Sequence, residues 1–145
     1  MTPSAFAAPA APGAQTPIAF DGEYVPGVCN IGPAEIARRR RAGHTGLIAA
    51  IALLAVLVAV GAPPIARLLI ALPVAIAASG YLQAYLKFCA GFGSAGVFNF
   101  GERGTTQAVA SPEARRKDRV RAFQISGASF AIGIAVGVVA VLLPI

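Results

Sequence analysis

Three long apolar stretches constrain the fold of this chain more than any other feature. They run from Thr45 to Ala62, from Ile65 to Leu86 and from Phe123 to Ile145. A helix of about 18 or more apolar residues is long enough to cross a hydrocarbon core of about 30 Å. With 57% hydrophobic and 12% charged residues, the chain is also more apolar than a typical soluble domain. The sequence therefore predicts an all-α membrane protein with three transmembrane helices, a helical hairpin followed by a third, C-terminal span.

Composition divides the chain into four segments. Residues 1–28 are rich in Ala and Pro, and prolines interrupt every run that could form the core of a signal peptide, so a flexible cytoplasmic tail is expected. Residues 29–104 contain the membrane hairpin, with spans at about 45–62 and 65–86. A basic cytoplasmic linker, residues 105–122, precedes the third span at residues 123–145.

The basic residues flank the apolar stretches unequally. Lys and Arg of short loops collect on the cytoplasmic side of a membrane. This rule predicts a multi-pass protein of the plasma or inner membrane, with a cytoplasmic N-terminus and linker and an external C-terminus. Such clusters attract anionic lipid headgroups, and since topology explains them, no nucleic-acid partner is expected. The residues predicted to serve topology and headgroup binding are Arg38, Arg39, Arg40, Arg41, Arg115, Arg116 and Lys117.

Several local expectations follow from single residues. Asn30 is a candidate N-cap for the first helix, which has Pro33 in its first turn. Arg67, alone beside the external turn, is expected to reach outward to the headgroups. Pro73 removes a helical hydrogen bond and is expected to kink the second span. The Gly- and Phe-rich segment 88–104 is expected to lie at the inner interface with its phenylalanines in lipid.

Small and polar residues recur at helical spacing on the second and third spans. Small residues let helix backbones approach closely, and Ser or Gln can hydrogen-bond a neighbouring helix where lipid cannot. This face can pack within the chain, against a copy or against another subunit, and a substrate path along it is the alternative. No ionisable residue lies at the centre of a span, which disfavours an ion-coupled transporter. The predicted packing face comprises Ala71, Ala75, Ser79, Gln83, Ser129, Gly133 and Gly137.

Two patterns raise the question of chemistry. The glycines of Gly91–Gly96 match G-x-G-x-x-G, but this motif follows a membrane helix instead of a strand, so no dinucleotide site is expected. Cys29 and Cys89 are the only cysteines, and the topology places both near the cytoplasmic surface. They are either packing thiols or a redox or persulfide pair. With the single His44 they fall short of a four-ligand zinc site. We therefore predict no catalytic, cofactor-binding or metal-binding residues, and no cofactor.

From residue 29 to residue 99 the chain resembles the YgaP-like transmembrane domain family, whose members occur alone or attached to a rhodanese. Ala90 departs from the family pattern, in which Pro usually follows the cysteine. The resemblance implies a dimeric membrane hairpin with cytoplasmic ends and thiol sulfur chemistry close to Cys89. The residues that carry it are Asn30-Ile31-Gly32, Glu35, Arg38–Arg41, Phe88-Cys89, Gly93 and Gly96.

Three functions remain open from the sequence. The expected one is a non-enzymatic, self-associating or accessory subunit of a membrane complex. The alternative is a thiol-dependent sulfur or redox relay at the cytoplasmic face, with Cys89 as its centre and Cys29 as resolving partner. An oligomeric exporter of small molecules is the third, without a clue to its substrate.

Overall fold

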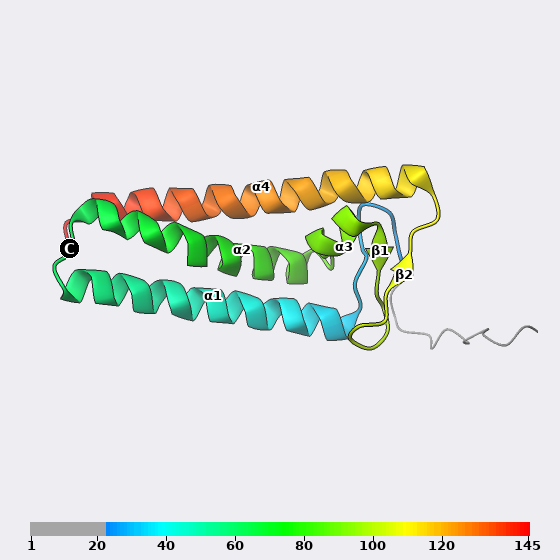
Figure 1. Ribbon diagram of the computed structural model, residues 1–145, viewed down its shortest axis with the longest axis horizontal. Helices are drawn as coiled ribbons and strands as arrows, with labels where there is room; N and C mark the ends of the chain where they lie inside the picture. Colours follow the sequence, from blue (N-terminus) through cyan, green and yellow to red (C-terminus); the bar gives the residue numbers. More distant parts are fainter. Residues whose placement is uncertain (1–22) are drawn as a thin grey trace, which may run out of the picture.

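The computed structural model describes residues 23–145, so the predicted tail lies largely outside the described residues. Three long helical segments lie side by side, and α2 packs against both α1 and α4 (Figure 1). Short elements between α2 and α4 cover one end of this row. In chain order the elements are α1 (Pro33–Ala59), the 3-10 helix η1 (Pro64–Ile70), α2 (Ala71–Tyr85), α3 (Ala90–Ala95), β1 (Val97–Phe98), β2 (Gln107–Ala108) and α4 (Pro112–Leu142).

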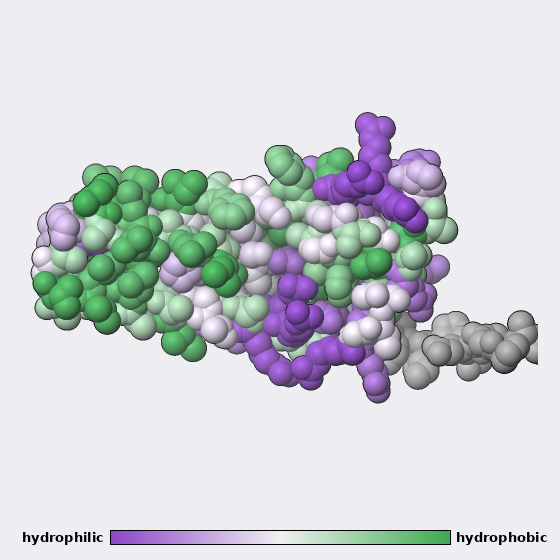
Figure 2. Space-filling model, in the orientation of Figure 1, coloured by the Kyte–Doolittle hydropathy of each residue, from purple (hydrophilic) through white to green (hydrophobic). Residues whose placement is uncertain are grey.

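The expected helical architecture is confirmed. Three helices, α1, η1 with α2, and α4, are long and apolar enough to cross a membrane. Many of their large apolar side chains are exposed. One half of the molecule has an almost entirely hydrophobic surface, whereas hydrophilic side chains gather on the other half (Figure 2). We call the hydrophilic half, formed by residues 23–41 and 87–122, the charged end.

Both basic clusters lie at the charged end. The N-terminal ends of α1 and α4 are found there, beside α3 and the two strands, whereas the turn before η1 and the C-terminus lie at the opposite, apolar end (Figure 1). The strands pair antiparallel, with Val97 opposite Ala108 and Phe98 opposite Gln107. The basic linker is therefore largely structured, because α4 starts at Pro112 and continues without interruption into the apolar stretch.

Glycines set the close approach of α1 and α2. A Cβ atom added to Gly46 would lie 2.6 Å from the backbone nitrogen of Ala77. A Cβ atom on Gly80 would overlap the backbone nitrogen of Gly43 and lie 2.7 Å from the carbonyl oxygen of Arg39. Real Cβ atoms do not approach this closely, so the helix pair depends on three glycines that lie outside the predicted packing face.

The predicted packing faces of the second and third spans lie against each other within the chain. A Cβ atom on Gly133 would overlap the carbonyl oxygen of Ala71 and lie 2.8 Å from the Cβ of Ala75. At Gly137 it would lie 3.2 Å from the Cβ of Ala71. Ser129 is buried in the same contact and donates to the carbonyl oxygen of Ile125 at 2.8 Å. The closest part of this surface is thus already occupied in the single chain.

Two of the local expectations for the second span are wrong. Arg67 does not reach headgroups, because its buried guanidinium donates to the carbonyl oxygens of Ala140, Leu143 and Ile145, which the end of α4 leaves without helical partners. Pro73 does not kink a continuous helix. The change from 3-10 to α geometry at Ala71 places Pro73 in the first turn of α2, where a missing N–H costs little.

The Gly- and Phe-rich segment folds onto the protein instead of lying in lipid. Phe88 is fully buried and packs against Ala122 and Ile125 of α4. Phe98 stacks on Tyr24, with ring centroids 4.6 Å apart. Residues 23–28, assigned to the flexible tail from the sequence, form a turn that closes on itself through a bridge between Val25 and Cys29.

The glycine contacts predict a sharp difference between two positions of α4. We expect Gly133→Leu to destabilise the protein by about 1–3 kcal/mol, because the new side chain must displace α2. Gly127→Leu, whose Cβ would meet nothing within 4 Å, is the control and should leave stability equal or slightly higher. Thermal unfolding in mild detergent measures both, and equal melting temperatures would contradict the packing described here.

Candidate functional site at the charged end

Most of the buried polar side chains gather at the charged end. A polar group buried away from water needs a hydrogen-bond partner, so each of these side chains must be satisfied by the surrounding fold. They come from segments that are far apart in the sequence. Their hydrogen bonds therefore show which segments of the chain the fold holds together. Within the described residues they are Asn30, Glu35, Asn99 and Asp118. Gln83 of α2 is buried next to the charged end, and the buried thiol of Cys89 lies within it.

Asn30 ties the chain before α1 to the chain after α2. Its side-chain oxygen accepts from the backbone nitrogen of Cys89 at 2.6 Å, and its side-chain nitrogen donates to the carbonyl oxygen of Cys89 at 3.0 Å. Its backbone bonds Lys87 on one side and Asn99 on the other. The predicted N-cap role is thus wrong, since Gly32 occupies the N-cap of α1 without a side-chain bond. The amide satisfies two buried groups of another segment instead.

Cys89 is fully buried and acts as the N-cap of α3. Its sulfur accepts from the backbone nitrogen of Phe92 at 3.4 Å and lies 2.9 Å from Nη2 of Arg39. Arg39 therefore turns inward, whereas Arg40 and Arg41 remain exposed. Within residues 23–145, Nε of Arg39 is buried without a hydrogen-bond partner.

The second cysteine is placed differently. Cys29 is half-buried at the end of the turn formed by residues 23–29, and its sulfur lies 3.9 Å from the carbonyl oxygen of Ile31. Both cysteines are free thiols. The structure places both at the charged end, the end that the sequence assigns to the cytoplasm.

Glu35 and Arg38 form an ion pair in the first two turns of α1. Arg38 Nη1 lies 3.3 Å from Oε2 of Glu35, whose side chain is 1% exposed. A carboxylate in the first turn of a helix is stabilised by the helix dipole as well as by the arginine. Arg38 is thus engaged in part with the protein.

Asp118 fixes the turn of residues 23–29 on α4. Its two carboxylate oxygens accept from the backbone nitrogen of Gly27 at 2.7 Å and from the hydroxyl of Tyr24 at 2.8 Å. Burial, the hydrogen bond and the negative charge of Asp118 together raise the pKa of Tyr24 above its usual value. Asp118 was missed from the sequence, although it is the only acid in the basic run from Arg115 to Arg121.

A groove of about 260 Å³ crosses the three long helices next to this cluster. Gln83 connects the two, because its Nε2 donates to Ser79 at 2.7 Å and its Oε1 accepts from the backbone nitrogen of Ala90 at 3.0 Å. We call this feature the lateral groove. It is lined by Arg39, Ala42, Leu72, Ala75, Ile76, Ser79, Gly80, Gln83, Ser126, Ser129 and Phe130.

The basic cluster at the start of α4 is mostly exposed. Arg115 Nε donates to the carbonyl oxygen of Val109 at 2.6 Å, and Lys117 pairs with Glu113 at 3.1 Å. No group of three potential metal ligands occurs within residues 23–145. His44 is instead bonded to the hydroxyl of Tyr81, at 2.7 Å from its Nδ1.

Comparisons of the chain with protein-family models, with curated proteins and with solved structures found no match. The resemblance to the YgaP-like family therefore stays a prediction.

The Tyr24–Asp118 hydrogen bond predicts a pH-dependent stability. Below pH 10 the phenol is protonated in both folded and unfolded protein, so the bond contributes fully. As the pH rises above about 10, the unfolded state releases its proton first, and stability falls. Tyr24→Phe should remove about 1.5–3 kcal/mol at neutral pH and flatten this alkaline decline. Denaturant unfolding of the wild type and of Tyr24→Phe at pH 7 and pH 11 tests this prediction. It would be contradicted if the free energy of unfolding fell equally with pH in both proteins.

Proposed function

We propose that this chain is a multi-pass integral membrane protein of the plasma or inner membrane, with its charged end in the cytoplasm, and that it serves as a non-enzymatic subunit assembling with other transmembrane helices. Support for the membrane placement comes from three long apolar helices whose outward side chains are exposed along one half of the molecule. The concentration of Arg and Lys at the other end supports the orientation.

The lateral groove is the observation that carries the assembly proposal. Its rim includes the exposed side chains of Leu72, Ile76 and Phe130, so it opens on the outer face of the helix row. Its interior holds the polar side chains of Ser79 and Ser126. Polar groups facing hydrocarbon are unfavourable, and a helix from a copy or another subunit would cover them and supply hydrogen-bond partners.

The internal packing changes which surface is available for assembly. Gly133 and Gly137 are in contact with α2, so a partner cannot use them without separating the helices of the chain. An assembling partner is therefore expected at the lateral groove, whose lining includes Ala75, Ser79, Gln83 and Ser129 of the predicted packing face but not its two glycines.

Filling the groove tests this proposal. Ser126→Leu places an apolar side chain where a partner helix would pack, and we expect it to reduce self-association or co-purified partner about tenfold, the effect of about 1.4 kcal/mol. Ala128→Leu, an exposed position two residues away, is the matched control. Purification in mild detergent with mass spectrometry and size measurement gives the readout. A wild-type protein that is monomeric and alone would overturn the proposal.

A second candidate function is a thiol-dependent sulfur or redox relay centred on Cys89. The observation that favours it is the approach of Arg39 Nη2 to the sulfur at 2.9 Å, together with the Phe92 N–H. The sulfur therefore has a cationic side chain and a backbone N–H beside it, the kind of polar surroundings in which reactive cysteines are found. Because Cys89 is fully buried, such a relay requires an opening of the charged end.

Labelling of persulfides and disulfides in the folded protein tests the relay. In a Cys29→Ser background the label should depend on Cys89 and should fall several-fold in Arg39→Gln, because this substitution removes the cationic group that contacts the sulfur. Arg40→Gln, which removes an exposed charge from the neighbouring position, should have little effect. Labelling that persists in Cys89→Ser would contradict a relay through this residue.

A further inference from the structure

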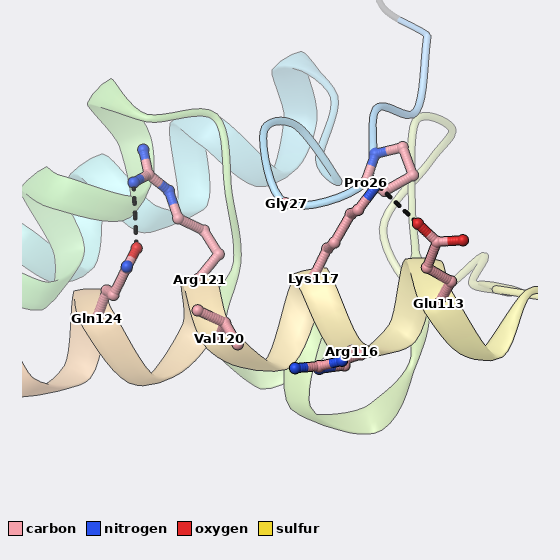
Figure 3. A pocket seen from close by; sticks show the side chains of 8 residues that line it. All are labelled: Pro26, Gly27, Glu113, Arg116, Lys117, Val120, Arg121 and Gln124. Carbon is pink, nitrogen blue, oxygen red and sulfur yellow. Dashed lines mark hydrogen bonds and ion pairs between the residues drawn. The ribbon is translucent and has the colours of Figure 1, made fainter.

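A second cavity, separate from the lateral groove, lies on the charged end between α4 and the turn of residues 23–29. Its volume is about 490 Å³, and Figure 3 shows its lining side chains. We call it the basic cavity. It is lined by Pro26, Gly27, Glu113, Arg116, Lys117, Val120, Arg121 and Gln124.

The walls of the basic cavity are fixed by the fold. Gly27 has a φ of +73°, a conformation that favours glycine, and its backbone nitrogen donates to Asp118 at 2.7 Å. The turn rests directly on the helix, since a Cβ atom on Gly27 would lie 3.3 Å from the Cβ of Lys117. The other wall is α4 itself. The cavity is therefore formed by two elements that a buried carboxylate joins.

The charges of the basic cavity are unbalanced. Glu113, Lys117 and Arg121 follow one another at four-residue spacing and point toward the side of α4 that faces the turn (Figure 3). Glu113 pairs with Lys117 at 3.1 Å, which leaves the charges of Arg116 and Arg121 without a carboxylate among the lining residues. Three cations and one anion therefore line the space, and they favour an anionic occupant.

Arg121 has unused hydrogen-bonding capacity. Its only side-chain bond within residues 23–145 joins Nη1 to Gln124 Oε1 at 3.5 Å, the limit for such a bond. Its Nε is buried and has no acceptor in that part of the chain. A buried N–H without an acceptor is costly, and a phosphate oxygen is a strong acceptor for a guanidinium.

The position of the basic cavity along α4 indicates which class of anion would reach it. The helix is charged up to Arg121 and uncharged beyond it, and the apolar side chains of Val120 and Phe123 are exposed at this boundary. In the proposed membrane placement this boundary is the level of the lipid headgroups, where an acyl chain can follow the exposed apolar side chains outward from the site.

We infer that the basic cavity binds the phosphate of an anionic glycerophospholipid from the cytoplasmic leaflet. Arg121 and Lys117 donate to the phosphate oxygens from α4, while the Pro26–Gly27 turn closes the opposite side. This inference rests on the proposed membrane placement. It differs from general attraction of lipid to basic residues, because it requires a discrete site whose occupancy depends on particular side chains.

Native mass spectrometry of the full chain tests this site, with phosphatidylglycerol as the probe and phosphatidylcholine, a zwitterion of zero net charge, as the comparison. We expect Arg121→Gln to lower the affinity for phosphatidylglycerol about fivefold, the effect of one cation near a membrane surface. Arg119→Gln removes the same charge from the exposed part of α4 outside the cavity and is the matched control, with less than a twofold effect expected. Lys117→Gln provides a second variant if Arg121→Gln melts at lower temperature than the wild type.

Each outcome bears on the inference. A lower affinity for phosphatidylglycerol in Arg121→Gln or Lys117→Gln, with the binding of phosphatidylcholine unchanged, supports the lipid site. An equal loss of affinity in Arg119→Gln would show that net charge alone attracts the lipid, and it would overturn the inference of a discrete site. If inorganic phosphate binds in lipid-free micelles as tightly as phosphatidylglycerol does, and loses its affinity in the same variants, the lipid source is overturned and the cavity is assigned to a soluble phosphate. Extraction of the wild type by alkaline carbonate would instead overturn the membrane placement, so the two failures are distinguishable.

Discussion

The two hydrogen bonds between the side chain of Asn30 and the backbone of Cys89 hold the charged end together. They join the segment that precedes α1 to the segment that follows α2, so they close the helical hairpin at the end opposite its short turn. Both backbone groups are buried, and each would cost about 1–3 kcal/mol if it were left unpaired. Once Cys89 is fixed, α3 begins on its sulfur and Arg39 is drawn inward. One short side chain thus sets the positions of three segments.

The central position of α2 determines which surfaces remain available for partners. It needs close contact with α1 on one side, through Gly80, and with α4 on the other, through Ala71 and Ala75. Without a hydrophobic effect between helices in lipid, such close van der Waals contact is the main source of attraction. The smallest residues are therefore used inside the chain. What is left outward is the lateral groove, which has Ser79 and Ser126 in its lining and the exposed side chains of Leu72, Ile76 and Phe130 at its rim. The proposed partner helix is assigned to this surface.

The sequence was sufficient for features that depend on composition over many residues and insufficient for those that depend on distant contacts. Hydropathy predicted three helices, and the uneven distribution of Lys and Arg predicted which helix ends lie together. Arg67 and Phe88 were both assigned to the lipid interface, because nothing local indicates the free carbonyl groups of α4 or the apolar face of Ala122 that receive them. Asn30 offered an ordinary cap pattern, yet its partner lies 59 residues away. A search for charges that break a local pattern would have found Asp118.

Asp118 is a buried acid within the basic segment of α4, and its hydrogen bonds anchor the turn of residues 23–29. The five cations between Arg115 and Arg121 are mostly exposed, and because water and salt screen exposed charges they would not hold the turn in one position. A carboxylate beneath the turn offers two acceptors in fixed positions, and Tyr24 and Gly27 supply the two donors. Its negative charge also offsets part of the basic cluster, so the cationic side chains can lie close to one another. The same interaction therefore orders residues 23–29 and gives the neighbouring basic cavity its second wall, which connects the fold of the charged end to its electrostatics.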